Sequence, residues 1–114
     1  FDVAHGAGLA AVWGSWARYV CEAAPERFSA FAWNVMDVSR ELSSMDAALA
    51  GIEAMEAYFR SVNMPVSVSD MGIRLTDAQI EELSEKCSIA DSITIGVVKR
   101  LKKSDMIKIY QMAK

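Results

Sequence analysis

The feature that most constrains the fold is the spacing of apolar side chains, which recur every three or four residues along most of the chain. From His5 to Glu22 these side chains are Leu9, Val12, Trp13, Trp16, Tyr19 and Val20. Residues with this period lie on one face of an α-helix, and that face must be buried against other elements. The segment therefore predicts an amphipathic helix from about His5 to Glu22.

Two further helices are expected before residue 63. Pro25 stands at the first position of one of them, where its missing N–H has no hydrogen bond to lose. The apolar face of this second helix consists of Phe28, Phe31, Ala32, Val35 and Met36. Ser43 or Ser44 can cap the third helix through its side-chain oxygen. The buried face of the third helix consists of Ala48, Leu49, Ile52, Met55, Phe59 and Val62.

The tripeptide Asn63-Met64-Pro65 is expected to end the third helix. Asn tolerates the left-handed conformation, and the residue before a proline avoids the α region. The alternating Val66-Ser67-Val68-Ser69 then predicts a short extended link through the turn at residues 70–75. Thr76-Asp77-Ala78-Gln79 has the pattern of a capping box. It predicts a fourth helix that carries Ile80, Leu83 and Cys87 on one face.

The segment from Ile93 to Leu101 is ambiguous, because its β-branched residues favour a strand but no partner strand is evident. Ser104 is expected to cap a last helix. The apolar face of that helix consists of Met106, Ile107, Tyr110 and Ala113. With 114 residues and no internal repeat, the chain is expected to form one all-α domain, a bundle of five or six helices.

Charge and apolar runs argue against several function classes. The net charge of −3 does not suit a nucleic-acid-binding surface, which needs a basic face. No apolar run approaches the roughly 18–20 residues that span a bilayer, and Arg18 interrupts the nearest candidate, residues 7–20. Cys21 and Cys87 lack CxxC spacing, so neither a disulfide scaffold nor a zinc knuckle is expected. Two structural, reduced cysteines fit a cytoplasmic protein.

His5 is the single histidine, and glycines flank it at Gly6 and Gly8 at the start of the first helix. One interpretation is a histidine that only forms hydrogen bonds. The other is a metal ligand, because the helix N-terminus favours the neutral imidazole that a metal needs. The two glycines would leave room for a cofactor or substrate, and Asp2 could orient the ring as a neighbouring carboxylate. The residues alone leave both interpretations open.

Other residues that could take part in binding or catalysis are expected to have structural roles instead. Trp13, Trp16 and Trp33 stand at helical spacing beside aliphatic residues, which indicates core or interface. Gly14 costs about 1 kcal/mol relative to alanine inside a helix, so it is expected to permit a close helix crossing. The basic run Lys99-Arg100-Leu101-Lys102-Lys103 is typical of a solvated face, with a nucleotide-phosphate contact as the alternative. No set of catalytic residues can be assembled, so no catalytic or cofactor-binding residue is assigned.

An ordered set of segments resembles the iron-containing (group III) alcohol dehydrogenases, and within them the butanol dehydrogenase branch. The first segment, Phe1-Asp2-Val3-Ala4-His5-Gly6-Ala7-Gly8-Leu9-Ala10, resembles the last metal-ligand motif of that family. Further landmarks follow in the same order and spacing. They are 16–20, the helix Arg27–Val38, Gly51-Ile52-Glu53-Ala54 through Phe59-Arg60-Ser61, Asn63-Met64-Pro65, Leu75-Thr76 through Leu83, and 105–110. The resemblance covers nearly the whole chain.

The resemblance implies that residues 1–114 are the C-terminal part of the helical, dehydroquinate synthase-like metal domain, without the dinucleotide-binding domain that precedes it. It implies Fe²⁺ or Zn²⁺, NAD(P) and a primary alcohol or aldehyde in the parent enzyme. Only the final metal ligand of the family maps onto this sequence, at His5. The other ligands are an Asp, a His four residues after it, and one further His, all upstream of the motif. The chain alone is therefore expected to be inactive and to bind no cofactor tightly, and its exposed cut surface could pair two copies.

Two departures and one alternative accompany this interpretation. Trp13-Gly14-Ser15 stands where an aromatic-Pro-small sequence is common in the family. The segment 94–98 replaces an Asn-Pro loop, so the family's substrate entrance does not transfer to it.

The alternative function is a stand-alone, non-catalytic helical interaction module. In that case Trp13 and Trp16 would face outward and present an apolar patch to a partner.

Overall fold

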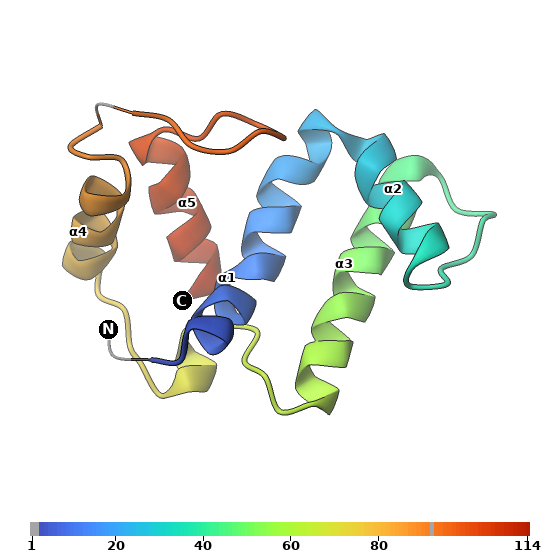
Figure 1. Cartoon of the computed structure of the whole chain (residues 1–114), viewed down its shortest axis with the longest axis horizontal. Helices are drawn as coiled ribbons and strands as arrows, with labels where there is room; N and C mark the ends of the chain where they lie inside the picture. The colour runs from blue at the N-terminus through green and yellow to red at the C-terminus, as the bar shows by residue number, and fades with distance from the viewer. Residues whose placement is uncertain (1–2, 92) are drawn as a thin grey trace.

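The computed structural model describes residues 3–91 and 93–114 and is all-α, with no strand among these residues (Figure 1). Its five α-helices are α1 His5–Val20, α2 Pro25–Asn34, α3 Ser44–Ser61, α4 Asp77–Cys87 and α5 Lys103–Ala113. Two short 3₁₀ helices, η1 Cys21–Ala23 and η2 Ser69–Met71, complete the regular structure. The expected fold class and the number of helices are both confirmed.

Helix α1 lies at the centre of the molecule, with α2 and α3 on one side and α4 and α5 on the other (Figure 1). The two helices of the first pair pack closely, because Gly51 of α3 faces Ala32 of α2. A Cβ atom at Gly51 would lie 2.5 Å from the Ala32 Cβ, which is too close for two side chains. On the other side, α5 contacts both α1 and α4.

The core forms where α1 meets α2, α3 and α5. Its largest buried side chains include Val20, Phe28, Ile52, Met106 and Ile109. Trp13 packs against Phe31 and Phe59, with ring centroids 6.1 and 5.9 Å apart, and Trp16 packs against Phe28 at 6.0 Å. The core interpretation of these two tryptophans is therefore confirmed. Both side chains are half-buried, so each keeps part of its surface exposed.

Several helix ends follow their local sequence. The Ser43 hydroxyl accepts a hydrogen bond from the Asp46 amide at 3.2 Å, so Ser43 is the cap of α3. Thr76 and Gln79 form the predicted reciprocal capping box at the start of α4. Asn63 adopts the left-handed conformation, with φ of 62°, two residues after α3 ends at Ser61. These predictions are confirmed.

Other boundaries differ from the prediction. Helix α2 ends at Asn34, so Val35 does not continue its buried face and is 67% exposed. Helix α5 begins at Lys103, which places Ser104 inside the helix rather than at its cap. The carboxylate of Asp105 instead accepts a hydrogen bond from the Lys102 amide at 3.0 Å. The expected extended link is also wrong, because Val68 has helical backbone angles and leads directly into η2.

The ambiguous segment forms an irregular loop, here called the 95–101 loop, closed by an antiparallel bridge between Ile95 and Leu101. Their two backbone hydrogen bonds measure 3.0 and 2.7 Å. Gly96 supports the turn with φ of 96°, where a side chain would collide with the Lys99 carbonyl. Val98 packs against the core, whereas Val97 is 97% exposed. The β-branched residues thus form a bridge without a sheet.

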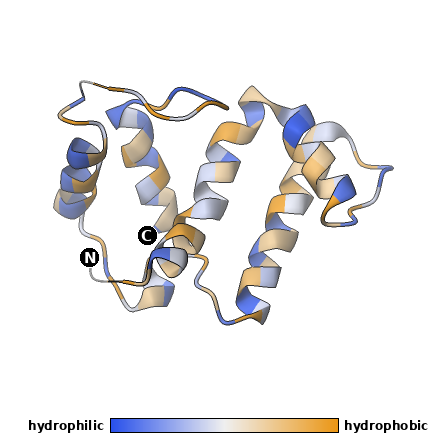
Figure 2. Cartoon of the chain, viewed as in Figure 1, coloured by the Kyte–Doolittle hydropathy of each residue, from blue (hydrophilic) through white to orange (hydrophobic). Residues whose placement is uncertain are grey.

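The surface of the bundle is uneven in polarity. Figure 2 shows α4 coloured mainly as hydrophilic, in keeping with its exposed Glu81, Glu82, Glu85 and Lys86. Among the described residues, no helix combines the length and apolar character that crossing a membrane requires.

Candidate metal centre

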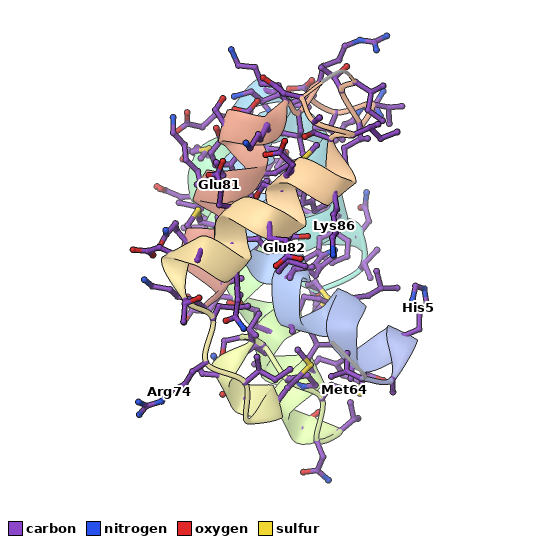
Figure 3. The ribbon with its side chains drawn as sticks, turned by 90° about the vertical axis from the view of Figure 1, so that its left-hand side faces the viewer. His5, Met64, Arg74, Glu81, Glu82 and Lys86 are labelled. Atoms are coloured by element: carbon purple, nitrogen blue, oxygen red, sulfur yellow. The ribbon has the colours of Figure 1, made fainter. Side chains whose placement is uncertain are left out.

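His5 is the first residue of α1 and is exposed. Figure 3 shows its side chain projecting outward from the first turn of the helix. The preceding residue, Ala4, offers no side-chain cap, and no acidic residue lies in the first turn. The imidazole is therefore open to a group approaching from outside the bundle.

The glycines that flank His5 leave space around the first turn. A Cβ atom at Gly6 would lie 3.9 Å from the Met64 Cε, and one at Gly8 would lie 3.5 Å from the Val3 Cγ2. Both are ordinary van der Waals distances, so packing inside this chain does not require glycine at either position. Room for a ligand beside His5 remains a prediction.

The described residues contain no group of three or more His, Cys, Asp or Glu side chains that could hold a metal ion. A catalytic metal site normally takes about three protein ligands. Asp2, the predicted neighbouring carboxylate, lies outside the described residues. The residues present thus fit the role of one ligand at the edge of a metal site, and they do not form a complete site.

A hollow of about 510 Å³ opens beside the start of α1, between Ala7, Arg60, Met64 and Asp70. Its one carboxylate is already engaged, because Asp70 Oδ2 accepts a hydrogen bond from the Val66 amide at 3.0 Å. The Asp70 amide in turn donates to the Ser67 hydroxyl at 3.2 Å. The two Asp70 contacts therefore stabilise the turn before η2, and His5 is not among the residues that line this hollow.

The two cysteines have different environments. Cys21 is fully buried, and burial raises the pKa of its thiol, which suits the structural role predicted for it. Cys87, the last residue of α4, is exposed. Both are free thiols.

The basic run forms specific contacts and is not simply solvated. Lys103 bridges two carboxylates of α4, with its Nζ 2.5 Å from Glu81 and 2.6 Å from Glu85. Lys99 places its Nζ 4.9 Å from the ring centroid of Tyr19. These contacts join the 95–101 loop and α5 to the bundle. The expectation of a solvated face is met at Lys99, which is exposed, and is wrong at Lys103, whose side chain is only 20% exposed.

Two polar links that anchor α1 gave no local signal in the sequence. Arg18 forms an ion pair with Glu56 of α3, whose side chain is buried. The Tyr19 hydroxyl donates to Asp105 Oδ1 of α5 at 2.5 Å, and this hydrogen bond raises the pKa of Tyr19 to about 12. Each link joins residues far apart in sequence. Together they fix the helix that begins with His5.

Comparison with known protein families matches residues 1–114 to the Fe-containing alcohol dehydrogenase family, C-terminal part. The chain belongs to this family. In this chain, the C-terminal part of an iron-containing alcohol dehydrogenase is an all-α bundle whose first helix begins with an exposed histidine.

Individual relatives agree with this assignment. The chain is 30% identical over 112 residues to the probable NADH-dependent butanol dehydrogenase 1 of Bacillus subtilis, and 22% identical to NADH-dependent butanol dehydrogenase A of Clostridium acetobutylicum. Each alignment covers 97% of this chain and 28% of the relative. The crystal structure of NADH-dependent butanol dehydrogenase A from Thermotoga maritima matches with a TM-score of 0.84 and 29% identity, over 99% of this chain and 29% of that one. The chain therefore spans less than a third of the length of these relatives.

Proposed function

We propose that residues 1–114 form the C-terminal, metal-side portion of a metal-dependent NAD(P)-linked alcohol dehydrogenase, and that His5 is one of its metal ligands. The observation that carries the proposal is the family match over the whole chain, combined with an exposed imidazole at the first residue of α1. The relatives named as NADH-dependent butanol dehydrogenases support a primary alcohol or aldehyde as substrate and NADH as cofactor.

A bound Fe²⁺ or Zn²⁺ ion would act as a Lewis acid that polarises the substrate oxygen. The contribution of this chain is to hold one imidazole in a fixed position. Helix α1 suits that task, since the Arg18–Glu56 ion pair and the Tyr19–Asp105 hydrogen bond tie it to α3 and α5. A ligand held on a rigid helix is more accurately placed than one held on a loop.

The remaining ligands and the dinucleotide-binding domain belong, in this proposal, to a part of the enzyme outside residues 1–114. Alone, the chain offers one imidazole and is expected not to turn over substrate. The family match over the whole chain favours this proposal over the interaction-module alternative, and the half-buried Trp13 and Trp16 pack against Phe31, Phe59 and Phe28. Two free cysteines are consistent with a reducing cytoplasmic location, which we include in the proposal.

A chimera tests the proposal directly. The segment of the Bacillus subtilis enzyme that aligns with this chain is replaced by residues 1–114, and the iron content and NADH-dependent reduction of butanal are measured. We expect the chimera to retain iron and activity. His5→Ala should lower both at least tenfold, whereas Arg74→Ala, at an exposed position, should lower neither.

A folded chimera that keeps its iron after His5→Ala would show that His5 is not a ligand. The gene sequence upstream of the codon for Phe1 gives an independent measurement that does not depend on folding. The proposal requires further metal-ligating residues and a nucleotide-binding region there. A stop codon or an unrelated domain in that position would overturn it.

A further inference from the structure

The large apolar side chains of α1 lie on the face of the helix that the rest of this chain leaves open. Apart from the terminal Val20, the buried residues of α1 are small: Ala10, Ala11, Gly14, Ser15 and Ala17. By contrast, Leu9 is 56% exposed, and Val12 and Trp16 are half-buried. The apolar face predicted for α1 is therefore only partly covered by the other helices.

His5 lies on the same open face. His5, Leu9, Val12 and Trp16, here called the α1 stripe, are separated by four, three and four residues. At 3.6 residues per turn, their side chains point within about 60° of one another around the helix axis. Figure 3 views the bundle edge-on and shows His5 projecting beyond one of its broad faces. The candidate metal ligand and the exposed apolar side chains therefore face the same way.

The bundle is thin and open for a chain of its length. Its principal extents are 43, 31 and 19 Å, and Figure 1 views it along the shortest. Since packed helices lie about 8–10 Å apart, the shortest extent holds at most two layers of helices. The radius of gyration is 14.7 Å, whereas a compact domain of this length has about 13 Å. The accessible surface is 6881 Å², against about 6,200 Å² for a folded monomer of this mass. A further layer would cover this excess surface.

The proposed metal site indicates what covers the α1 stripe. This chain spans less than a third of the length of its relatives, and in the proposed function the other metal ligands belong to the remainder. Metal–ligand bonds are about 2 Å long, so those ligands must lie beside His5, one helical turn from Leu9. A second copy of this chain would bring only one more histidine. The position of His5 therefore favours the remainder of the parent enzyme over a second copy.

We propose that the α1 stripe is the docking face for the part of the parent enzyme that carries the remaining metal ligands. That part presents an apolar surface to Leu9, Val12 and Trp16, and it presents its ligands to His5. Burial of the three apolar side chains holds the two parts together, so docking needs no bound metal. The inference rests on the proposed function, but it concerns the docking face and not the identity of the ligand.

Substitution of Leu9 separates docking from the folding of this chain. In the isolated chain Leu9 is exposed, so Leu9→Asp should leave the urea midpoint unchanged. In the Bacillus subtilis chimera, stripped of metal with a chelator, the same change puts a charge into an apolar contact and should lower the urea concentration at which unfolding begins. Leu49→Asp, at a leucine of α3 that is 39% exposed, should have no effect in either protein. An unchanged chimera after Leu9→Asp would overturn the proposal.

Hydroxyl-radical footprinting measures the same contact without a substitution. Docking covers the Trp16 ring, so its oxidation should be at least threefold slower in the metal-free chimera than in the isolated chain. Tyr58, which is 55% exposed on α3, should react equally in both proteins. Equal oxidation of Trp16 in the two folded proteins would refute the docking face.

These measurements also distinguish this inference from the proposed function. Protection of Trp16 in a metal-free chimera that keeps its iron after His5→Ala would support the docking face and remove the ligand role of His5. An unprotected Trp16, in a chimera that loses its iron after His5→Ala, would do the reverse. Sedimentation equilibrium tests the other occupant. A dimer of the isolated chain that Leu9→Asp dissociates, together with an unprotected Trp16 in the chimera, would assign the α1 stripe to a second copy.

Discussion

The side chain of Glu56 on α3 occupies the space that a side chain at Gly14 of α1 would need. A Cβ atom at Gly14 would lie 2.7 Å from the Glu56 Cδ. Glu56 is 7% exposed and pairs with Arg18, one turn further along α1. Gly14 thus leaves room for the Glu56 side chain and its ion pair with Arg18. The close approach predicted at Gly14 is therefore between the α1 backbone and a side chain of α3, not between two helix backbones.

Replacement of Gly14 by alanine is expected to destabilise the protein. Alanine normally stabilises a helix interior by about 1 kcal/mol relative to glycine. Here the added methyl group must displace Glu56, and overpacking of this kind costs about 1–3 kcal/mol. We therefore expect Gly14→Ala to lower the free energy of unfolding, measured by urea denaturation.

Gly8→Ala is the matched control in the same helix. Its added Cβ would lie 3.5 Å from the Val3 Cγ2, an ordinary contact, so this variant should be neutral or slightly stabilised. The double variant Gly14→Ala/Glu56→Ala should lose less stability than the sum of its single changes, since they share one space. Equal stabilisation by Gly14→Ala and Gly8→Ala would contradict the steric argument.

The hydrogen bond from Tyr19 to Asp105 predicts a specific alkaline destabilisation. It raises the pKa of Tyr19 from 10.0 to about 12, so the folded state holds this proton more tightly than the unfolded state. The stabilisation is fully present below pH 10 and is lost as the pH rises toward 12. Tyr19→Phe should therefore lower the free energy of unfolding at neutral pH and reduce its fall between pH 10 and pH 12.

Lys103 contributes to the same alkaline region, because Glu81 and Glu85 raise its pKa as well. Its contribution is common to the protein and to Tyr19→Phe, so the difference between their stability curves isolates Tyr19. Tyr58→Phe, at a position 55% exposed, is the control and should leave the curve unchanged. Identical curves for Tyr19→Phe and the unaltered protein would rule out the proposed linkage.

Local interactions account for what the sequence predicted correctly. Ser43 and Asp46, and likewise Thr76 and Gln79, are three residues apart, so their caps depend on little beyond the helix itself. The three- or four-residue spacing of apolar side chains likewise depends only on the helix that contains them. All five helices were therefore predictable, and His5 was singled out as a candidate metal ligand through a family motif that is contiguous in sequence.

Contacts between distant segments account for the errors. Asp105 rather than Ser104 sets the start of α5, because its carboxylate also receives the Tyr19 hydroxyl from α1. The apolar residues Val35 and Met36 continue the period of α2, but the helix ends before them. The link between Gly14 and Glu56 depends on how α1 crosses α3, which no local pattern encodes.

The 95–101 loop offers a paired test of its packing. Val97 is 97% exposed, whereas its neighbour Val98 packs against the core and lines a hollow with Trp13 and Phe28. Val98→Asp places a charge against apolar side chains and should cost about 1–3 kcal/mol. Val97→Asp should change stability by less than about 0.5 kcal/mol. Equal effects in urea denaturation would show that the loop does not pack as described.

His5 is expected to matter for metal binding in the parent enzyme and not for the folding of this chain. Its side chain is exposed, and its neighbours Gly6 and Gly8 make no tight contacts. His5→Ala should therefore shift the free energy of unfolding by less than about 0.5 kcal/mol, as should Lys108→Ala on the exposed face of α5. In the chain alone, one imidazole should bind Fe²⁺ or Zn²⁺ weakly, so gel filtration should remove the metal from both variants and from the unaltered protein. Stoichiometric metal retained by the unaltered chain, and lost in His5→Ala, would show that residues 1–114 already hold a complete site.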